Sequence, residues 1–144
     1  MDVLYDKDFY QWTLYNAELL RQGKITEIDI QNIAEELESM GKSQKRELIS
    51  RLAVLIMHLL KWQYQPEKRS HSWIETINEQ RRQIVLLLED SPSLKHEIEE
   101  KITRAYNLAV ADTEKETGIR KKILPQTCPY AFDELRNSNF WPEQ

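Results

Sequence analysis

Residues 43–63 read SQKRELISRLAVLIMHLLKWQ, and their large apolar side chains recur at alternating steps of four and three. The repeat consists of Leu48, Leu52, Leu55, Leu59 and Trp62. Steps of four and three keep side chains on one face of an α-helix. Ile49, Ile56 and Leu60 widen this apolar stripe. A helix with so wide a stripe must be covered by other elements, so the segment predicts the central helix of the fold.

The flanking sequence carries the same periodicity and predicts further helices. With the central segment, we expect helices at about residues 6–21, 26–40, 43–63, 72–90 and 92–117. Gly23, Gly41 and Gly118 each follow a periodic run. Each is expected to end a helix, because glycine adopts the left-handed terminating conformation without steric cost. Ser91 and Pro92 read as an N-cap followed by proline at the first helical position.

These elements predict an all-α fold, a compact helical bundle of about five main helices with an irregular C-terminal tail. Pro125 and Pro129 prevent a long helix in the tail. The run Phe140-Trp141-Pro142 reads as an aromatic anchor that closes the bundle. The 144 residues suit one domain, and neither a repeat nor a flexible linker interrupts them. We therefore expect a single helical domain over residues 1–144.

The charge and composition of the chain argue against several classes of function. The net charge of −4 lacks the basic surplus of a nucleic-acid-binding protein, so nucleic acid is not an expected partner. Cys128 is the sole cysteine, which excludes an internal disulfide. The N-terminus has no basic start followed by an apolar stretch, and no apolar run reaches the roughly 18 residues of a membrane span. The sequence favours a cytoplasmic protein without membrane contact.

Arg81 occupies an unusual position for a charged residue. It shares an apolar helical seam with Ile77 and Ile84. A buried guanidinium requires a carboxylate or an anion within reach. The candidate partners are Glu36 first, then Asp29 and Glu79. Two readings stay open: a structural ion pair that docks two helices, or the binding of a ligand's carboxylate or phosphate.

Residues 61–73, KWQYQPEKRSHSW, interleave cations with aromatic rings. In nucleic-acid-binding proteins, aromatic rings stack on bases and cations bind phosphates. Arg69 and His71 also lie at the start of a predicted helix, where backbone N–H groups favour anions. The candidate anion site consists of Arg69, His71, Arg81, Trp62 and Trp73. The alternative is an interhelical loop with serine caps, in which both tryptophans belong to the core.

Metal and nucleophile chemistry have little support in the sequence. No glutamate lies three residues before His58, His71 or His96, so the sequence has no Glu-x-x-His pair of the kind that binds a di-iron centre. We therefore expect neither a metal nor another cofactor. Cys128 lies between Thr127 and Pro129 and reads as a small buried thiol without a local activating signature. No catalytic residue is assigned, and the sequence leans away from an enzyme.

Several segments together resemble a bacterial family catalogued as domain of unknown function number twenty-nine. They are YDKDFYQW at residues 5–12, AEELESMG at 34–41, HLLKW at 58–62, SWIETI at 72–77, EQR at 79–81, DSPSL at 90–94, CPY at 128–130 and FWP at 140–142. The resemblance implies an all-helical bundle and a bacterial cytoplasmic protein, and it implies no activity. Polar residues within these segments are hypothesised to converge in one buried cluster: Glu35, Glu36, His58, Lys61 and Arg81.

Two functional hypotheses follow. The first is a non-enzymatic interaction module that binds a protein partner or a second copy of itself, since no nucleophile–base or metal-ligand spacing is visible. An exposed apolar patch near residues 130–141 would support it. The second is an anion- or nucleotide-binding protein, enzymatic or not, that uses the basic and aromatic residues at the start of the helix expected at 72–90.

Overall fold

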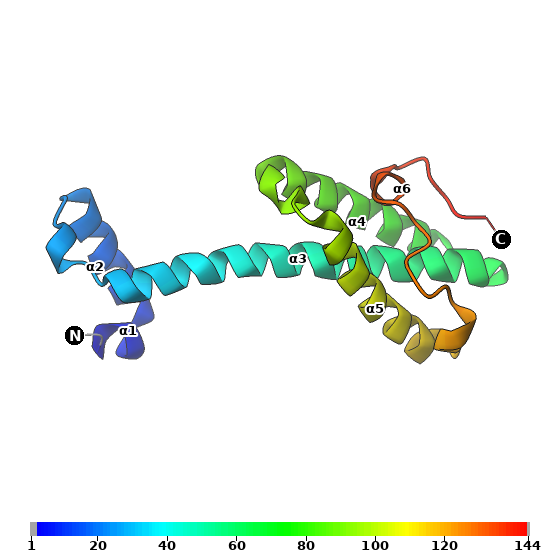
Figure 1. Cartoon of the computed structure of the whole chain (residues 1–144), viewed down its shortest axis with the longest axis horizontal. Coiled ribbons are helices and arrows are strands. Elements are labelled where there is room, and N and C mark those ends of the chain that lie inside the picture. Colours follow the sequence, from blue (N-terminus) through cyan, green and yellow to red (C-terminus); the bar gives the residue numbers. More distant parts are fainter. Residues whose placement is uncertain (1–2, 144) are drawn as a thin grey trace. The chain divides into compact units, whose positions relative to one another are not determined.

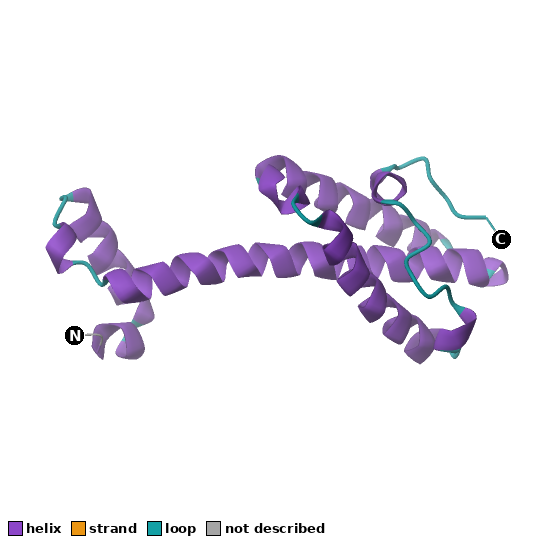
Figure 2. Ribbon diagram, viewed as in Figure 1, coloured by secondary structure: helices purple, strands orange, loops and turns teal. Residues whose placement is uncertain are grey.

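The computed structural model describes residues 3–143, and every regular element within that range is helical (Figure 2). The α-helices are α1 (Val3–Lys7), α2 (Phe9–Arg21), α3 (Ile30–Tyr64), α4 (His71–Asp90), α5 (Ile98–Thr117) and α6 (Phe132–Arg136) (Figure 1). Short 3-10 turns lie at Ile25–Glu27, Pro66–Lys68, Pro92–Lys95 and Lys121–Ile123. Together these elements include 79% of the described residues. The predicted all-α fold is confirmed.

The two helices expected at residues 26–40 and 43–63 are one continuous helix, α3. The expectation that Gly41 ends a helix is therefore wrong. A glycine inside a helix costs only about 1 kcal/mol relative to alanine, and glutamate, leucine, methionine and lysine around it are good helix formers. Gly23 and Gly118 do follow the ends of α2 and α5 in the left-handed conformation, with φ of 73° and 79°.

The helix expected at residues 92–117 begins later, at Ile98. Pro92 opens a 3-10 turn, Pro92–Lys95, and Glu97 then takes a left-handed φ of 53° that separates this turn from α5. Lys101 is buried and holds the turn, because its ammonium donates hydrogen bonds to the carbonyls of Leu94 and His96. Proline at the first position fits a short turn as well as a long helix, so the sequence alone could not separate the two.

The backbone groups into two compact units, Met1–Ser43 and Gln44–Gln144. In the second unit, α4 and α5 pack on the second half of α3 (Figure 1). The leucine repeat of α3 forms the centre of this core. Its fully buried members are Leu48, Leu52, Leu55 and Leu59. The prediction that residues 43–63 contain the central helical segment is confirmed for this unit.

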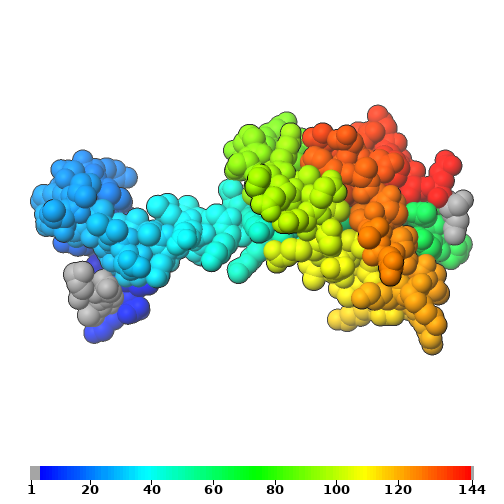
Figure 3. All heavy atoms as spheres, in the orientation of Figure 1, coloured from blue at the N-terminus to red at the C-terminus, as the bar shows by residue number. Residues whose placement is uncertain are grey.

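The C-terminal tail belongs to the core of the second unit. Tyr130 and Leu135 are buried in it, and Phe140 and Trp141 pack against it. Figure 3 shows the tail, in orange and red, lying against the surface of α4 and α5. The aromatic anchor predicted at residues 140–142 is present.

The first unit has a small core. Trp12, Asn16 and Leu19 of α2 are its buried residues among those described. The indole of Trp12 donates a hydrogen bond to Asp29 at 2.9 Å. The side-chain oxygen of Asn16 accepts one from the backbone N–H of Asp29 at 2.8 Å. Two apolar side chains and a few polar bonds thus fix α2 against the start of α3.

Gly41→Ala is expected to raise the free energy of unfolding by about 0.5–1 kcal/mol, because alanine is the better helix former. A Cβ at this position meets no atom within 4 Å. Urea denaturation followed by circular dichroism measures the change. Gly118→Ala is the control and is expected to lower stability by about 1 kcal/mol, since an L side chain is strained at positive φ. A loss of stability in Gly41→Ala would contradict the continuous helix.

Candidate functional site

Arg81 is buried on α4, with 3% of its surface exposed. Its Nε donates a hydrogen bond to the carbonyl of Leu135 at 2.8 Å, and Nη2 donates one to the carbonyl of Glu134 at 3.2 Å. The guanidinium lies 5.7 Å from the ring centre of Trp141. Burial lowers the pKa of Arg81 to about 10, which leaves it charged at neutral pH. Arg81 therefore fastens the C-terminal tail to α4.

The expectation that Arg81 pairs with a carboxylate is wrong, and the reason is local. Its two acceptors are carbonyls near the C-terminal end of the short helix α6, where backbone oxygens carry partial negative charge. The carbonyl of Glu134 also accepts a hydrogen bond from the backbone N–H of Asn137 at 3.3 Å. The expected partners are engaged elsewhere. Glu36 accepts a hydrogen bond from Tyr5 at 2.6 Å, and Glu79 pairs with Arg82.

Part of the expected cation–aromatic cluster does assemble in the second unit. The Nε of Arg69 donates to the backbone carbonyl of Trp62 at 2.8 Å, and its guanidinium lies 4.7 Å from the Trp62 ring centre. Trp62 in turn contacts Trp141 at a centroid distance of 4.7 Å. Trp141 then links this group to Arg81. The rings already contact cations and one another, which favours a structural role over the stacking of a ligand.

The remaining residues of the proposed anion site have other contacts. The ammonium of Lys61 lies 4.9 Å from the ring centre of Trp73 and pairs with Glu116 at 3.0 Å. His71 is exposed and lies 2.7 Å from Glu75, one turn further along α4. Trp73 is half-buried. The structure thus brings Arg69, Trp62 and Arg81 together through Trp141, and places His71 with Glu75.

The five residues hypothesised to share one polar cluster have separate partners. Glu35 is exposed, and Glu36 accepts the bond from Tyr5, which raises the pKa of that tyrosine to about 12. The Nδ1 of His58 lies 2.9 Å from the carbonyl of Val54, and burial lowers the pKa of His58. The other two members, a lysine and an arginine, make the contacts described above.

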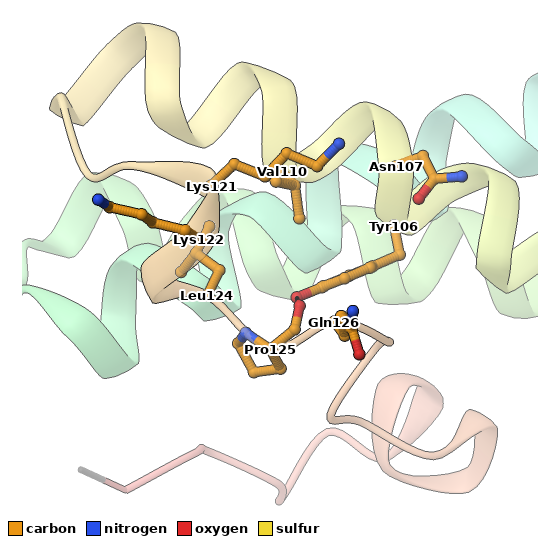
Figure 4. Close-up of a pocket in the computed structure, with 8 residues that line it drawn as sticks. All are labelled: Tyr106, Asn107, Val110, Lys121, Lys122, Leu124, Pro125 and Gln126. Carbon is orange, nitrogen blue, oxygen red and sulfur yellow. Dashed lines mark hydrogen bonds between the residues drawn. The ribbon is translucent and has the colours of Figure 1, made fainter.

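Two cavities of similar size lie in the second unit. One, of about 660 Å³, is formed by α5 and residues 121–126 (Figure 4). The Tyr106 hydroxyl donates to the Pro125 carbonyl at 2.5 Å within it, and Val110 and Leu124 supply apolar wall. The ammonium of Lys122 points away from the other labelled side chains (Figure 4). Sequence reasoning did not predict this cavity, because its two walls are distant in the chain.

The other cavity, of about 630 Å³, is lined by Arg81, Arg82 and Arg136 together with apolar and small polar residues. Each arginine already has a partner in the chain. Arg82 pairs with Glu79, Arg136 pairs with Asp133 at 2.7 Å, and the third bonds the carbonyls of α6. Carboxylates thus compensate the charges of Arg82 and Arg136, whereas Arg81 donates to neutral carbonyls and its buried Nη1 has no hydrogen-bond partner among the described residues.

Residues 3–143 offer little to thiol or metal chemistry or to a membrane crossing. Burial raises the pKa of the Cys128 thiol, which disfavours the reactive thiolate. No group of three or more histidine, cysteine or carboxylate side chains there is placed to hold a metal ion. None of the described helices combines the length and the apolar character that a membrane crossing requires.

The largest set of exposed apolar side chains lies in the first unit. We call it the N-terminal apolar surface, and it consists of Phe9, Tyr10, Leu14, Tyr15, Leu20, Ile25, Ile30, Leu37 and Met40. Each of these side chains is at least 45% exposed. In the second unit the exposed large apolar residues are Val85, Leu86, Leu108 and Ile123.

An exposed apolar patch near residues 130–141 would have supported the interaction module, but none of the exposed large apolar side chains within residues 3–143 lies there, because the tail is packed into the core. The tail aromatics are covered because Arg81 holds α6 against α4. The sequence did contain a signal for the observed surface. Ile30, Ile33, Leu37 and Met40 recur at steps of three and four, and the structure leaves all but Ile33 exposed.

A family model described as "Domain of unknown function DUF29" matches residues 4–141. The chain belongs to this family. The predicted resemblance is thereby confirmed over nearly the whole length. No curated protein and no solved structure matches the chain significantly. The DUF29 match spans both the tail contacts of Arg81 and the N-terminal apolar surface, so each lies within the family's region.

Arg81→Met in this DUF29 chain is expected to lower the free energy of unfolding by about 2–4 kcal/mol, because it removes two hydrogen bonds and leaves the buried carbonyl of Leu135 without the donor that Arg81 supplies. Urea denaturation measures the loss, and limited proteolysis at the tail reports its release. Arg82→Met is the control, since Arg82 is exposed and forms a surface pair worth at most about 1 kcal/mol. Equal losses in the two variants would contradict the role of Arg81.

The burial of His58 predicts a pH dependence of stability. Because its folded pKa lies below the ordinary value of 6.5, the unfolded chain binds a proton at higher pH than the folded chain does. The stabilising contribution is complete above pH 6.5 and falls as the pH drops toward the folded pKa. In His58→Gln, the free energy of unfolding measured by urea denaturation is expected to fall less as the pH drops. The control His71→Gln, at an exposed position, is expected to keep the wild-type decrease. An unchanged profile in His58→Gln would refute the assignment.

Proposed function

We propose that this protein is an interaction module that binds a protein partner, or a second copy of itself, through the N-terminal apolar surface. One observation carries the proposal. The first unit exposes nine large apolar side chains, whereas Trp12 and Leu19 are the apolar residues it buries among those described. Such a ratio is the reverse of what a self-sufficient fold requires.

Leaving this apolar surface in water forgoes the free energy that its burial would contribute. Burial of apolar surface contributes about 25 cal/mol per Å². A unit of some 40 residues seldom has a core large enough to be stable by itself. A partner that covers the side chains around Leu37 and Met40, which are 62% and 64% exposed, would supply the missing burial. Large apolar side chains of this kind also dominate the binding energy of known protein interfaces.

The charged side chains of the second unit also support the proposal of an interaction module. The charged residues that the sequence singled out there hold the protein together: Arg81 bonds the tail, Lys61 pairs with Glu116, and Arg69 covers Trp62. These side chains make structural contacts within the second unit. The exposure of the N-terminal apolar surface has no comparable structural explanation.

The double variant Leu37→Ser/Met40→Ser tests the proposal. A tagged wild-type chain is expected to capture a stoichiometric partner from its host. The tagged double variant is expected to capture at least about tenfold less of that partner, since two highly exposed apolar contacts are lost. Quantitative mass spectrometry of the eluate measures the ratio, and size-exclusion chromatography with light scattering reports self-association.

Leu108→Ser/Ile123→Ser is the matched control, because both residues are exposed apolar positions of the second unit. It is expected to retain the partner. Equal capture by the two double variants would remove the N-terminal apolar surface from the interaction.

A further inference from the structure

Acidic and basic residues are distributed unequally between the two units. Met1–Ser43 contains nine acidic and four basic residues, whereas Gln44–Gln144 contains fifteen acidic and sixteen basic ones. The first unit therefore has a net charge of −5 and the second of +1 at neutral pH. The whole negative excess of the chain belongs to the unit that exposes the N-terminal apolar surface.

The imbalance is sharpest where α3 begins. Residues 25–41 contain five acidic residues and no lysine or arginine. Glu27, Glu35 and Glu38 are exposed, and their side chains enter none of the ion pairs formed within residues 3–143. Ile25 and Ile30 in the same stretch are 54% and 60% exposed. Apolar and anionic groups are thus presented side by side.

The exposed face of α3 has the shape that a second helix requires. Ile30, Ala34, Leu37 and Gly41 follow one another at steps of four, three and four, so they line one face, and all four are exposed. Two of them are small, and a Cβ on Gly41 would meet nothing within 4 Å. A helix laid along this face could approach closely between the larger side chains of Ile30 and Leu37.

We infer that the N-terminal apolar surface receives a basic amphipathic helix of a partner protein, an inference that rests on the proposed function. The partner's apolar stripe packs on Ile30, Leu37 and Met40. Its lysine and arginine residues pair with Glu38, which lies one turn beyond Ala34 at the edge of this face, and with Glu27 in the turn before α3. Charge complementarity of this kind increases the association rate and selects the partner.

The same charges disfavour a second copy as the occupant. Two first units would each bring a net charge of −5 to the interface, and residues 25–41 supply no cation to offset the repulsion. Nucleic acid and anionic lipid surfaces are disfavoured for the same electrostatic reason. A cationic partner alone gains from both the apolar and the acidic groups of this surface.

The experiment uses two synthetic helical peptides of about 18 residues, or roughly five turns. Both have the same leucine stripe, with lysine on the polar face of one and glutamate on that of the other. Fluorescence anisotropy with the full-length chain measures each dissociation constant at low and at physiological salt. The leucine–lysine peptide is expected to bind at least about tenfold more tightly than the leucine–glutamate peptide, and to weaken with salt.

Charge variants locate the binding surface. Glu27→Gln/Glu38→Gln is expected to weaken binding of the leucine–lysine peptide about fivefold, since two ion pairs are lost. The control removes the same number of charges from exposed positions of the second unit: Glu67→Gln/Glu89→Gln. This control variant is expected to bind the peptide as the wild type does. Equal weakening in both charge variants, or no preference for the lysine peptide, overturns the inference.

The outcomes also separate this inference from the proposed function. If Leu37→Ser/Met40→Ser abolishes partner capture while the leucine–lysine peptide fails to bind, the proposed function holds and the basic helix is wrong. If light scattering shows a wild-type dimer that this double variant dissociates, the occupant is a second copy and the inference fails. If capture is insensitive to the double variant, both the inference and the proposed function fall.

Discussion

The burial of the second half of α3 is the constraint on which the C-terminal unit depends. Its leucine repeat, from Leu48 to Leu59, is fully buried, so apolar surface must cover this helix on several sides. One side is covered by α4 through Ile77 and Ile84, and α5 adds a second stripe. The tail completes the enclosure with Tyr130 and Leu135. The long chain segment after α5 is irregular in its backbone yet belongs to the core.

Arg81 shows how a charge can lie within such a core without an acidic partner. The carbonyls near the C-terminal end of α6 offer the guanidinium two acceptors and a favourable partial charge. Trp141 covers it from another side and joins it to Trp62 and Arg69. The cations and aromatic rings whose composition resembles a ligand site therefore contact one another and the C-terminal tail. Their contacts explain the fold of the C-terminal unit more directly than they explain any chemistry.

The N-terminal unit has the opposite character. Its short helices bury Trp12 and Leu19, and much of its apolar surface remains in water together with an excess of carboxylates. Stability in a small unit with little core normally comes from a disulfide, a metal or an association. The lone cysteine of the chain, Cys128, lies outside this unit, and no metal cluster is formed by the described residues. The association that we propose would supply this burial, and the charge of the unit is the reason for proposing a basic partner.

The sequence by itself determined what depends on neighbours within one or two turns. Helical periodicity fixed the all-α class and the buried stripe of α3, and Gly23 and Gly118 marked two helix ends. The tertiary structure alone decided whether Gly41 interrupts a helix, which group accepts from Arg81, and which apolar side chains stay exposed. The continuity of α3 at Gly41 reflects a small difference in local helix propensity, whereas the other two outcomes depend on contacts between residues far apart in the chain. Periodicity fixes which residues share a face, whereas only the packed chain determines what covers that face.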